Sequence, residues 1–173
     1  MKSTWMSRHV VPTVLAAIAS AIAGSAISGC AGGSATGGSS AAVRAPIASD
    51  VERTTFAPSL GVHLDSMTRR VSGLYVQDLE TGTGAVVTRG RTAVVRYTGW
   101  LPDGKEIDSG EISVSVGSHQ TIPAWEEALL GMRVGGKRRI VTPPNLAYGS
   151  RGSGDIPPNA VLVFEMQVTD VEP

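Results

Sequence analysis

Hydrophobic and polar residues alternate with a two-residue period along several stretches of the chain beyond residue 71, which is typical of β-strands with one buried face. The clearest example follows Ile112, where valines at positions 114 and 116 alternate with serines. A hairpin turn is indicated by Pro102-Asp103-Gly104. The other predicted strands are Ser72–Glu80, Thr92–Leu101, Lys105–Asp108, Lys137–Thr142 and Ala160–Val171.

One segment has a helical period instead. Its apolar residues recur at positions i, i+3, i+4 and i+7, as Trp125, Ala128, Leu129 and Met132. Pro123 can occupy the first helical position, where the missing N–H costs nothing, and Gly131 ends the pattern. One short amphipathic helix among five or six strands predicts an α+β domain, in which one antiparallel sheet closes over the helix.

The N-terminal region has a different pattern. Lys2 and Arg8 precede an apolar run from Val10 to Ile27 that small residues follow. A basic start, an apolar middle and a small-residue end predict a secretory signal peptide over residues 1–29. The run is also long enough for a single membrane span, but its many Ala, Gly and Ser residues make that alternative weaker.

The end of this run, Ala26-Ile27-Ser28-Gly29-Cys30, resembles the signal of bacterial lipoproteins. The resemblance implies cleavage before Cys30 and attachment of lipid to its thiol. Two or more acyl chains give stable membrane anchoring. We therefore expect a lipid-anchored, extracytoplasmic protein of the cell envelope, on the periplasmic side in a Gram-negative cell. The alternative is that Cys30 is a spare thiol beside an ordinary cleavage site.

Residues 31–49 are rich in Gly, Ser and Ala and predict a flexible tether. Residues 50–70 contain more apolar residues, but Pro58 and Gly61 interrupt any long helix, so we interpret them as transitional. The predicted organisation is a signal peptide (1–29), a segment with the lipidated Cys30, the tether and the transitional part (30–70), and one folded domain (71–173).

Charge and composition exclude several function classes. The chain has 15 Lys+Arg and 15 Asp+Glu, and loss of Lys2 and Arg8 with the signal peptide leaves 13 against 15, a balance of −2. This charge does not favour nucleic-acid binding, which needs cations to neutralise phosphates. One Cys and three scattered His predict no metal site and no cofactor. The Lys137-Arg138-Arg139 run alternates across a strand, which indicates solvated surface.

Eight short motifs then occur in order along the predicted domain. They are Tyr97-Thr98-Gly99, Leu101-Pro102-Asp103-Gly104, Ile107-Asp108-Ser109, Ile122-Pro123-Ala124-Trp125-Glu126, Gly131-Met132, Ala147-Tyr148-Gly149, Ile156-Pro157-Pro158-Asn159-Ala160 and Leu162-Val163-Phe164. This set resembles the FKBP-type peptidyl-prolyl cis–trans isomerases over about residues 71–171. The resemblance implies a strongly twisted antiparallel sheet wrapped around the helix, with an apolar pocket between them.

The chemistry of such a pocket can be reasoned independently. Rotation about an amide bond crosses a barrier of ~18–20 kcal/mol because resonance must be broken. Water stabilises the planar, more polar amide better than the twisted one, so a dry pocket can favour the twisted form without an acid, a base or a nucleophile. X-Pro bonds are the natural target, since they populate the cis form appreciably.

The resemblance also implies roles for individual residues. Trp125 would form the floor under the prolyl ring, with Tyr97 and Phe164 as aromatic walls. Tyr148 would offer its hydroxyl to a substrate carbonyl, and Asp108 would place a carboxylate at the pocket edge. Without the family match, the three aromatic residues on apolar faces would be read as ordinary core, and Asp108 as a turn or surface carboxylate.

Further substrate contacts are implied at the rim. Thr121 and Ile122 would line it, with the Ile122 N–H donating to the substrate, and Ile156 would lie in a loop over the pocket. Ile107 and Ile112 stand where most members of the family carry aromatic residues. The segment from Ser109 to Glu111 is short and contains no basic residue that could pair with Asp108.

Two functions therefore remain open from the sequence. The first is an envelope-anchored prolyl isomerase that assists the folding of exported proteins. The second is a weakly catalytic FKBP-like module that binds proline-containing or exposed apolar segments. For either function the resemblance implies proline-containing peptide partners and a pocket that could accept macrolide inhibitors. We expect a monomer, because no long helical arm for dimerisation is present.

Overall fold

The computed structural model of the protein describes residues 49–173. The predicted signal peptide, Cys30 and the predicted tether up to residue 48 lie outside the described residues. Among the described residues, no helix is both long enough and apolar enough to cross a membrane.

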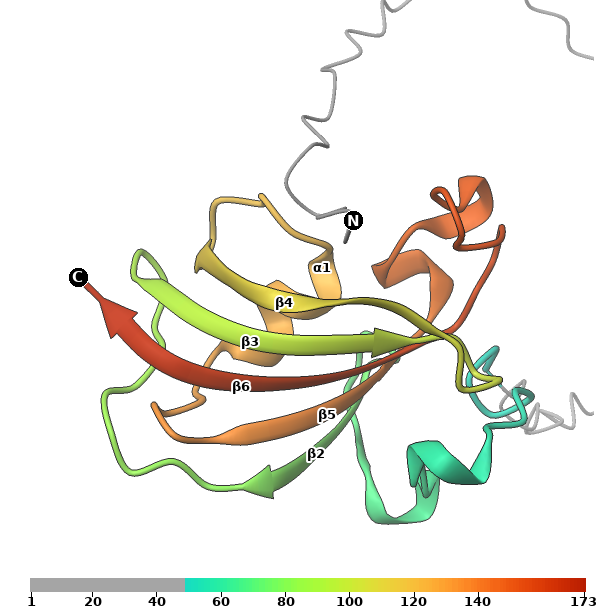
Figure 1. The fold of residues 1–173 in the computed structure, drawn as a ribbon, viewed down its shortest axis with the longest axis horizontal. Helices are drawn as coiled ribbons and strands as arrows, with labels where there is room; N and C mark the ends of the chain where they lie inside the picture. The colour runs from blue at the N-terminus through green and yellow to red at the C-terminus, as the bar shows by residue number, and fades with distance from the viewer. Residues whose placement is uncertain (1–48) are drawn as a thin grey trace, which may run out of the picture. The chain divides into compact units, whose positions relative to one another are not determined.

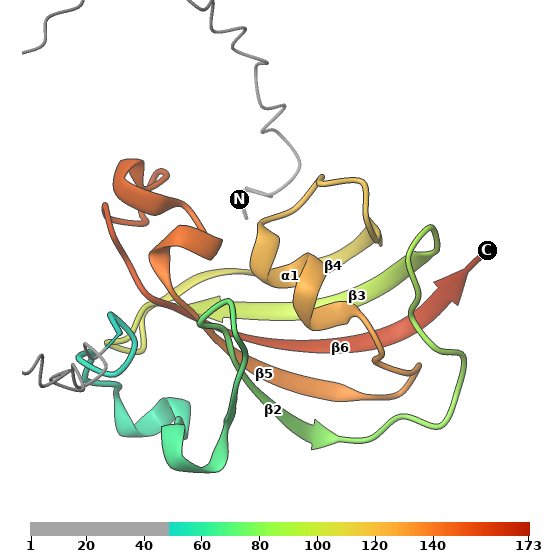
Figure 2. The same cartoon turned by 180° about the vertical axis from the view of Figure 1, so that it is seen from behind.

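Six strands form one antiparallel sheet in the order β1-β2-β5-β6-β3-β4. The strands are β1 (Thr68–Arg69), β2 (Tyr75–Glu80), β3 (Thr92–Trp100), β4 (Glu106–Ser115), β5 (Lys137–Thr142) and β6 (Leu162–Glu172). The helix α1 (Pro123–Leu129) lies behind the curved sheet in Figure 1 and in front of it in Figure 2. The predicted fold class is confirmed. The two short strands predicted around Gly110 are in fact one continuous strand, β4.

Four short 3₁₀ helices complete the described elements: η2 (Pro58–Leu60), η3 (Leu64–Ser66), η4 (Pro144–Leu146) and η5 (Gly149–Arg151). The first two precede the sheet. The last two lie in the long connection between β5 and β6, which in both views stands at one end of the sheet (Figures 1 and 2).

The alternating pattern determines the inner core. Ala93, Val95 and Tyr97 of β3 are at most 4% exposed, and Arg96 between them is exposed. On β6, Leu162, Phe164, Met166 and Val168 are almost fully buried on the same face. These residues form one cluster with Trp125, Ala128 and Leu129 of α1. The hydrophobic effect of this burial holds the helix against the sheet.

A second hydrophobic cluster lies on the other face of the sheet. It joins Val51, Leu60 and Met67 to Tyr75 of β2, Val141 of β5, Val163 of β6 and Val161, which directly precedes β6. Val51 is completely buried, and the Tyr75 hydroxyl donates to Glu52 Oε1 at 2.7 Å. Residues 50–70, which the sequence indicated to be transitional, therefore contribute buried side chains, and the packed part of the chain extends upstream of residue 71.

The basic run on β5 is not the solvated surface that the sequence predicted. Arg138 is 8% exposed, and its guanidinium donates to Asp78 Oδ1 at 2.6 Å and to the carbonyl oxygen of Ala128 at 2.5 Å. The Ala128 contact joins the sheet to α1. Arg139 donates to Glu165 and, at 2.6 Å, to the carbonyl oxygen of Gly61, which fastens the upstream segment to β5.

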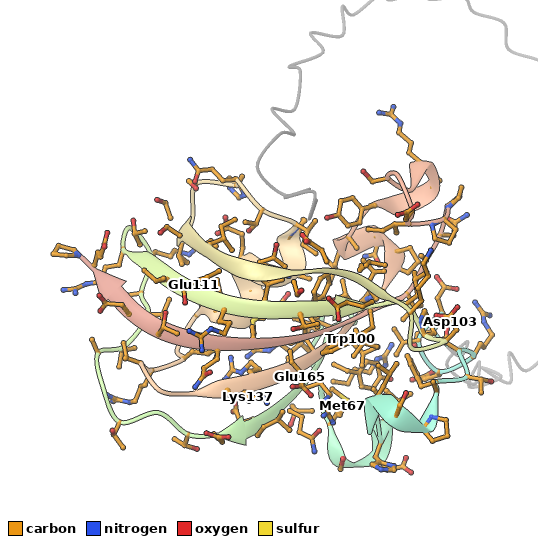
Figure 3. All side chains as sticks on the ribbon, in the orientation of Figure 1. Met67, Trp100, Asp103, Glu111, Lys137 and Glu165 are labelled. Atoms are coloured by element: carbon orange, nitrogen blue, oxygen red, sulfur yellow. The ribbon has the colours of Figure 1, made fainter. Side chains whose placement is uncertain are left out.

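Glu165 on β6 is the carboxylate that pairs with Lys137 and Arg139 of β5. It accepts hydrogen bonds from Arg139 and lies 3.1 Å from Lys137 Nζ; Figure 3 shows Lys137 and Glu165 close together on neighbouring strands. Burial alone would raise the pKa of Glu165, but the hydrogen bonds from Arg139 and Lys137 outweigh it, and the pKa is lowered. The ionised form therefore stabilises the folded state.

This shift predicts loss of stability in acid. Because the folded-state pKa of Glu165 lies below its unfolded value, the unfolded chain binds more protons there as the pH falls below about 5. Glu165→Gln should lower the free energy of unfolding by about 1–2 kcal/mol at pH 7, the scale of a hydrogen bond to a charged group, and by less at pH 3. Urea unfolding at both pH values measures the difference.

The control is Glu111→Gln, which removes an exposed carboxylate paired with Arg96. It should change the free energy of unfolding by less than about 1 kcal/mol at either pH, as is usual for surface ion pairs. Equal losses for Glu165→Gln at pH 7 and pH 3 would contradict the assignment.

Candidate active site

Three aromatic rings from three different elements meet between the sheet and the helix. Tyr97 comes from β3, Phe164 from β6 and Trp125 from α1. The Trp125 ring lies edge-on to Tyr97, with ring centroids 4.9 Å apart, and edge-on to Phe164, at 5.7 Å. Edge-to-face pairs of this kind are favourable beyond the area that they bury. The three rings therefore form a fixed apolar wall.

A pocket opens above this wall. Its lining comes from β3, β4, β6 and the β5–β6 connection: Tyr97, Ile107, Asp108, Tyr148, Ser153, Asp155, Ile156 and Phe164. Trp125 is fully buried behind Tyr97 and Phe164 and does not itself line the opening. Its indole Nε1 has no hydrogen-bond partner among the described residues.

Two consecutive residues of β4 enter the pocket because the strand is irregular there. The pairing between β3 and β4 shifts between Gly99, opposite Asp108, and Trp100, opposite Glu106. Ile107 is the extra residue of this bulge, and both Ile107 and Asp108 line the pocket. Bulges are frequent next to active sites, where they redirect a side chain.

Asp108 is held by two hydrogen bonds. Its Oδ2 accepts from the Tyr97 hydroxyl at 2.7 Å, and its Oδ1 accepts from the backbone N–H of Ser109 at 2.9 Å. The sequence offered no partner for this carboxylate. The structure supplies a phenol and a backbone N–H rather than a basic side chain.

Burial and the Asp108 carboxylate shift the pKa values of two phenols at the site. Burial, the hydrogen bond to Asp108 and its negative charge raise the pKa of Tyr97 well above the ordinary value of 10.0. Burial and the Asp108 carboxylate also raise the pKa of Tyr148. Both hydroxyls therefore keep their protons at neutral pH. The Tyr148 hydroxyl makes no hydrogen bond within residues 49–173 and is available to donate to a ligand.

The loop over the pocket has a constrained backbone. Ser153 and Ile156 exchange two backbone hydrogen bonds of 2.9 and 2.8 Å. Gly152 adopts φ 65° and ψ −166°, a conformation that is essentially restricted to glycine. A Cβ at Gly152 would lie 2.4 Å from the carbonyl oxygen of Ile156. The loop therefore holds Ser153, Asp155 and Ile156 in fixed positions at the opening.

A second loop, residues 117–122, leads into α1. The Glu126 carboxylate accepts from the backbone N–H of Gly117 at 2.5 Å and of His119 at 3.0 Å. Beyond these contacts, Thr121 and Ile122 are partly buried, and Ile122 packs against the inner cluster. The Ile122 N–H donates no hydrogen bond to any described residue, so it is free for a ligand.

The structure thus brings Tyr97, Ile107, Asp108, Tyr148, Ile156 and Phe164 to one pocket, with Trp125 behind them. Four predicted contacts are not part of its lining: Trp125, which was expected to form the floor, and Thr121, Ile122 and Ile112. Ile112 pairs with Val95 further along β4 and packs against the inner cluster. The catalytic and binding roles of all these residues stay predictions.

Sequence reasoning missed two lining residues, Ser153 and Asp155. Their only signal was their position between Gly152 and Ile156 in a glycine-rich loop. No group of His, Cys, Asp and Glu among residues 49–173 could hold a metal ion.

Comparisons with known proteins agree with this geometry. A family model described as FKBP-type peptidyl-prolyl cis-trans isomerase matches residues 84–169. A protein named FK506-binding protein from Neisseria meningitidis serogroup B is 37% identical over 107 residues, which are 58% of this chain and 98% of that protein.

Escherichia coli provides a further relative, named FKBP-type peptidyl-prolyl cis-trans isomerase FkpA. It is 42% identical over 125 residues, which are 70% of this chain and 44% of FkpA, so the chain spans less than half the length of that relative. The crystal structure of FkpA from E. coli gives a TM-score of 0.58 at 39% identity, covering 62% of this chain and 52% of that one. The chain therefore belongs to the family of FKBP-type peptidyl-prolyl cis–trans isomerases.

Proposed function

We propose that this FKBP-type peptidyl-prolyl isomerase acts on X-Pro bonds of exported proteins and assists their folding in the cell envelope, where lipid on Cys30 anchors it. The observation that carries the catalytic part is the pocket itself. Its walls are Tyr97, Phe164 and Ile107, with Trp125 behind them, and the partly buried carboxylate in its lining, Asp108, is already held by Tyr97. The envelope part rests on the residues around Cys30.

The geometry supports catalysis by shape and dryness. Apolar walls exclude the water that favours the planar amide, so the twisted amide is stabilised relative to the ground state. The Tyr148 hydroxyl and the Ile122 N–H can donate to two substrate carbonyls. Their donation would hold the peptide on both sides of the rotating bond without transferring a proton.

The competing function is a weakly catalytic peptide-binding module. The observation in its favour is Ile107, an aliphatic residue in the pocket lining. Exchange spectroscopy by NMR on a Leu-Pro peptide, with full-length protein in detergent, separates the two functions. Catalysed exchange well above the rate without protein supports the isomerase. Peptide binding without faster exchange would support the module.

The anchor is tested separately. Cys30→Ser removes the thiol that would carry the lipid, so the variant should take up no labelled palmitate and should remain unprocessed or leave the membrane fraction. Exchange activity of the folded domain should be unchanged, because the substitution lies outside residues 49–173. Equal size and equal absence of label in wild type and variant would show that the chain is not a lipoprotein.

Two further properties belong to this proposal. The Neisseria relative is named for binding FK506, and we extend macrolide binding in the same pocket to this chain, where such a ligand would compete with proline-containing peptides. We also propose that the protein is a monomer. Light scattering of the protein in detergent, corrected for the detergent mass, measures its oligomeric state.

A further inference from the structure

The pocket opening carries an unbalanced charge. Two carboxylates line it, Asp108 and Asp155, and no Lys, Arg or His is part of the lining. The remaining lining residues are aromatic or aliphatic, apart from Ser153. Any peptide that enters the pocket therefore meets negative charge only.

The two carboxylates differ in their surroundings. Asp108 is partly buried and accepts hydrogen bonds from Tyr97 and Ser109. Asp155 is exposed, and among the described residues it forms neither an ion pair nor a side-chain hydrogen bond. Arg151 on the same loop forms no ion pair with a described residue and is not part of the lining. The charge of Asp155 therefore faces whatever occupies the opening.

The loop holds Asp155 close to this position. Asp155 lies between Ser153 and Ile156, whose two mutual backbone hydrogen bonds close a tight turn, and Gly152 fixes the start of that turn. Because the turn already orders the backbone of Asp155, only its side chain has to be ordered when it binds a partner.

We propose that Asp155 determines charge specificity: the pocket prefers prolines that have a basic residue beside them and disfavours prolines that have an acidic neighbour. This inference rests on the proposed isomerase function. Because Asp155 is exposed, the preference is modest, and we expect about a twofold to fivefold ratio of kcat/KM between Lys and Glu, as for exposed ion pairs.

The experiment measures catalysed exchange by NMR with full-length protein in detergent. Four peptides carry Lys or Glu immediately before or immediately after the proline, and a fifth has uncharged neighbours. The variants are Asp155→Asn and Asp155→Lys. The matched control is Asp65→Asn, which removes an exposed carboxylate outside the pocket lining.

For wild type and Asp65→Asn, the Lys peptide should be turned over faster than the Glu peptide at one or both positions. The ratio should approach one in Asp155→Asn and invert in Asp155→Lys, with each rate expressed relative to that of the uncharged peptide for the same variant. It should also shrink at 1 M salt, where the screening length falls to about 3 Å.

The outcomes distinguish failure of the proposed isomerase function from failure of the charge preference assigned to Asp155. If no peptide is turned over, the proposed function fails. If the uncharged peptide is turned over but wild type does not distinguish Lys from Glu, or Asp155→Asn keeps the wild-type ratio, the charge preference assigned to Asp155 is overturned and the isomerase stands.

Discussion

Trp125→Ala should reduce kcat/KM for a Leu-Pro peptide at least tenfold and destabilise the domain by about 3–5 kcal/mol, the usual cost of removing a large buried aromatic side chain. Trp125 is fully buried and packs edge-on against both Tyr97 and Phe164. Its removal leaves a cavity behind the two rings, which can then tilt away from the positions that shape the pocket. Each tenfold loss corresponds to ~1.4 kcal/mol of transition-state stabilisation.

Unlike Trp125→Ala, Tyr148→Phe should lower the activity and leave the stability almost unchanged. The Tyr148 hydroxyl makes no hydrogen bond within residues 49–173, so the free energy of unfolding should change by less than about 0.5 kcal/mol, as for most substitutions outside such networks. Loss of one hydrogen bond to substrate should lower kcat/KM by about twofold to tenfold. Urea unfolding and NMR exchange on the same samples measure both quantities.

Trp125→Phe keeps the comparison informative if the Ala variant does not fold. It retains an aromatic ring and should be folded, with an intermediate loss of rate. Wild-type rates should also be constant between pH 6 and 8, because a phenol with the ordinary pKa of 10.0 is already protonated there and the raised pKa values of Tyr97 and Tyr148 move their titration further away. Wild-type activity in Trp125→Phe and Trp125→Ala would show that the indole does not shape the pocket.

The inner half of this fold could be predicted from sequence because β3 and β6 each carry a row of apolar residues on the face that packs against the helix. On β3, Arg96 and Thr98 alternate with Val95 and Tyr97, which identifies the buried face directly. Val141 of β5 and Val163 of β6 do not fit this pattern, since they are buried on the opposite face of the sheet. Their partners lie in residues 51–69, where Pro58 and Gly61 interrupt any period, so the outer cluster had no local signal.

The site, too, has a part that the sequence predicted and a part that it did not. The aromatic residues were predictable because their positions match a family pattern. The partner of Asp108 was not, because the hydrogen bond joins residues of two strands whose register includes a bulge. The burial of Arg138 depends on the Ala128 carbonyl at the end of a helix, which the sequence of β5 alone does not indicate. Such contacts are decided by tertiary geometry.

Gly99 on β3 leaves room for the Phe164 ring in the pocket wall, so a substitution there tests directly how the pocket keeps its shape. Gly99 pairs with Phe164 of β6, and a Cβ at Gly99 would lie 2.6 Å from Phe164 Cε1 and 2.8 Å from Cδ1. The Phe164 ring is 1% exposed and packs against Trp125, so it can yield only toward the pocket. Gly99→Ala should therefore cost about 1–3 kcal/mol, as overpacking usually does, and should lower kcat/KM at least tenfold.

Gly110→Ala is the matched control, because Gly110 occupies the equivalent place opposite Tyr97 on β4. A Cβ there would lie 3.8 Å from the nearest Tyr97 ring atom, an ordinary contact, so stability should change by less than about 0.5 kcal/mol and the rate by less than twofold. Combining Gly99→Ala with Phe164→Leu removes the clashing ring atoms, and the two stability losses should be clearly less than additive. Additive losses would contradict this account, and so would a Gly99→Ala variant as stable and active as Gly110→Ala. Either result would mean that the position of the Phe164 ring does not depend on glycine at position 99.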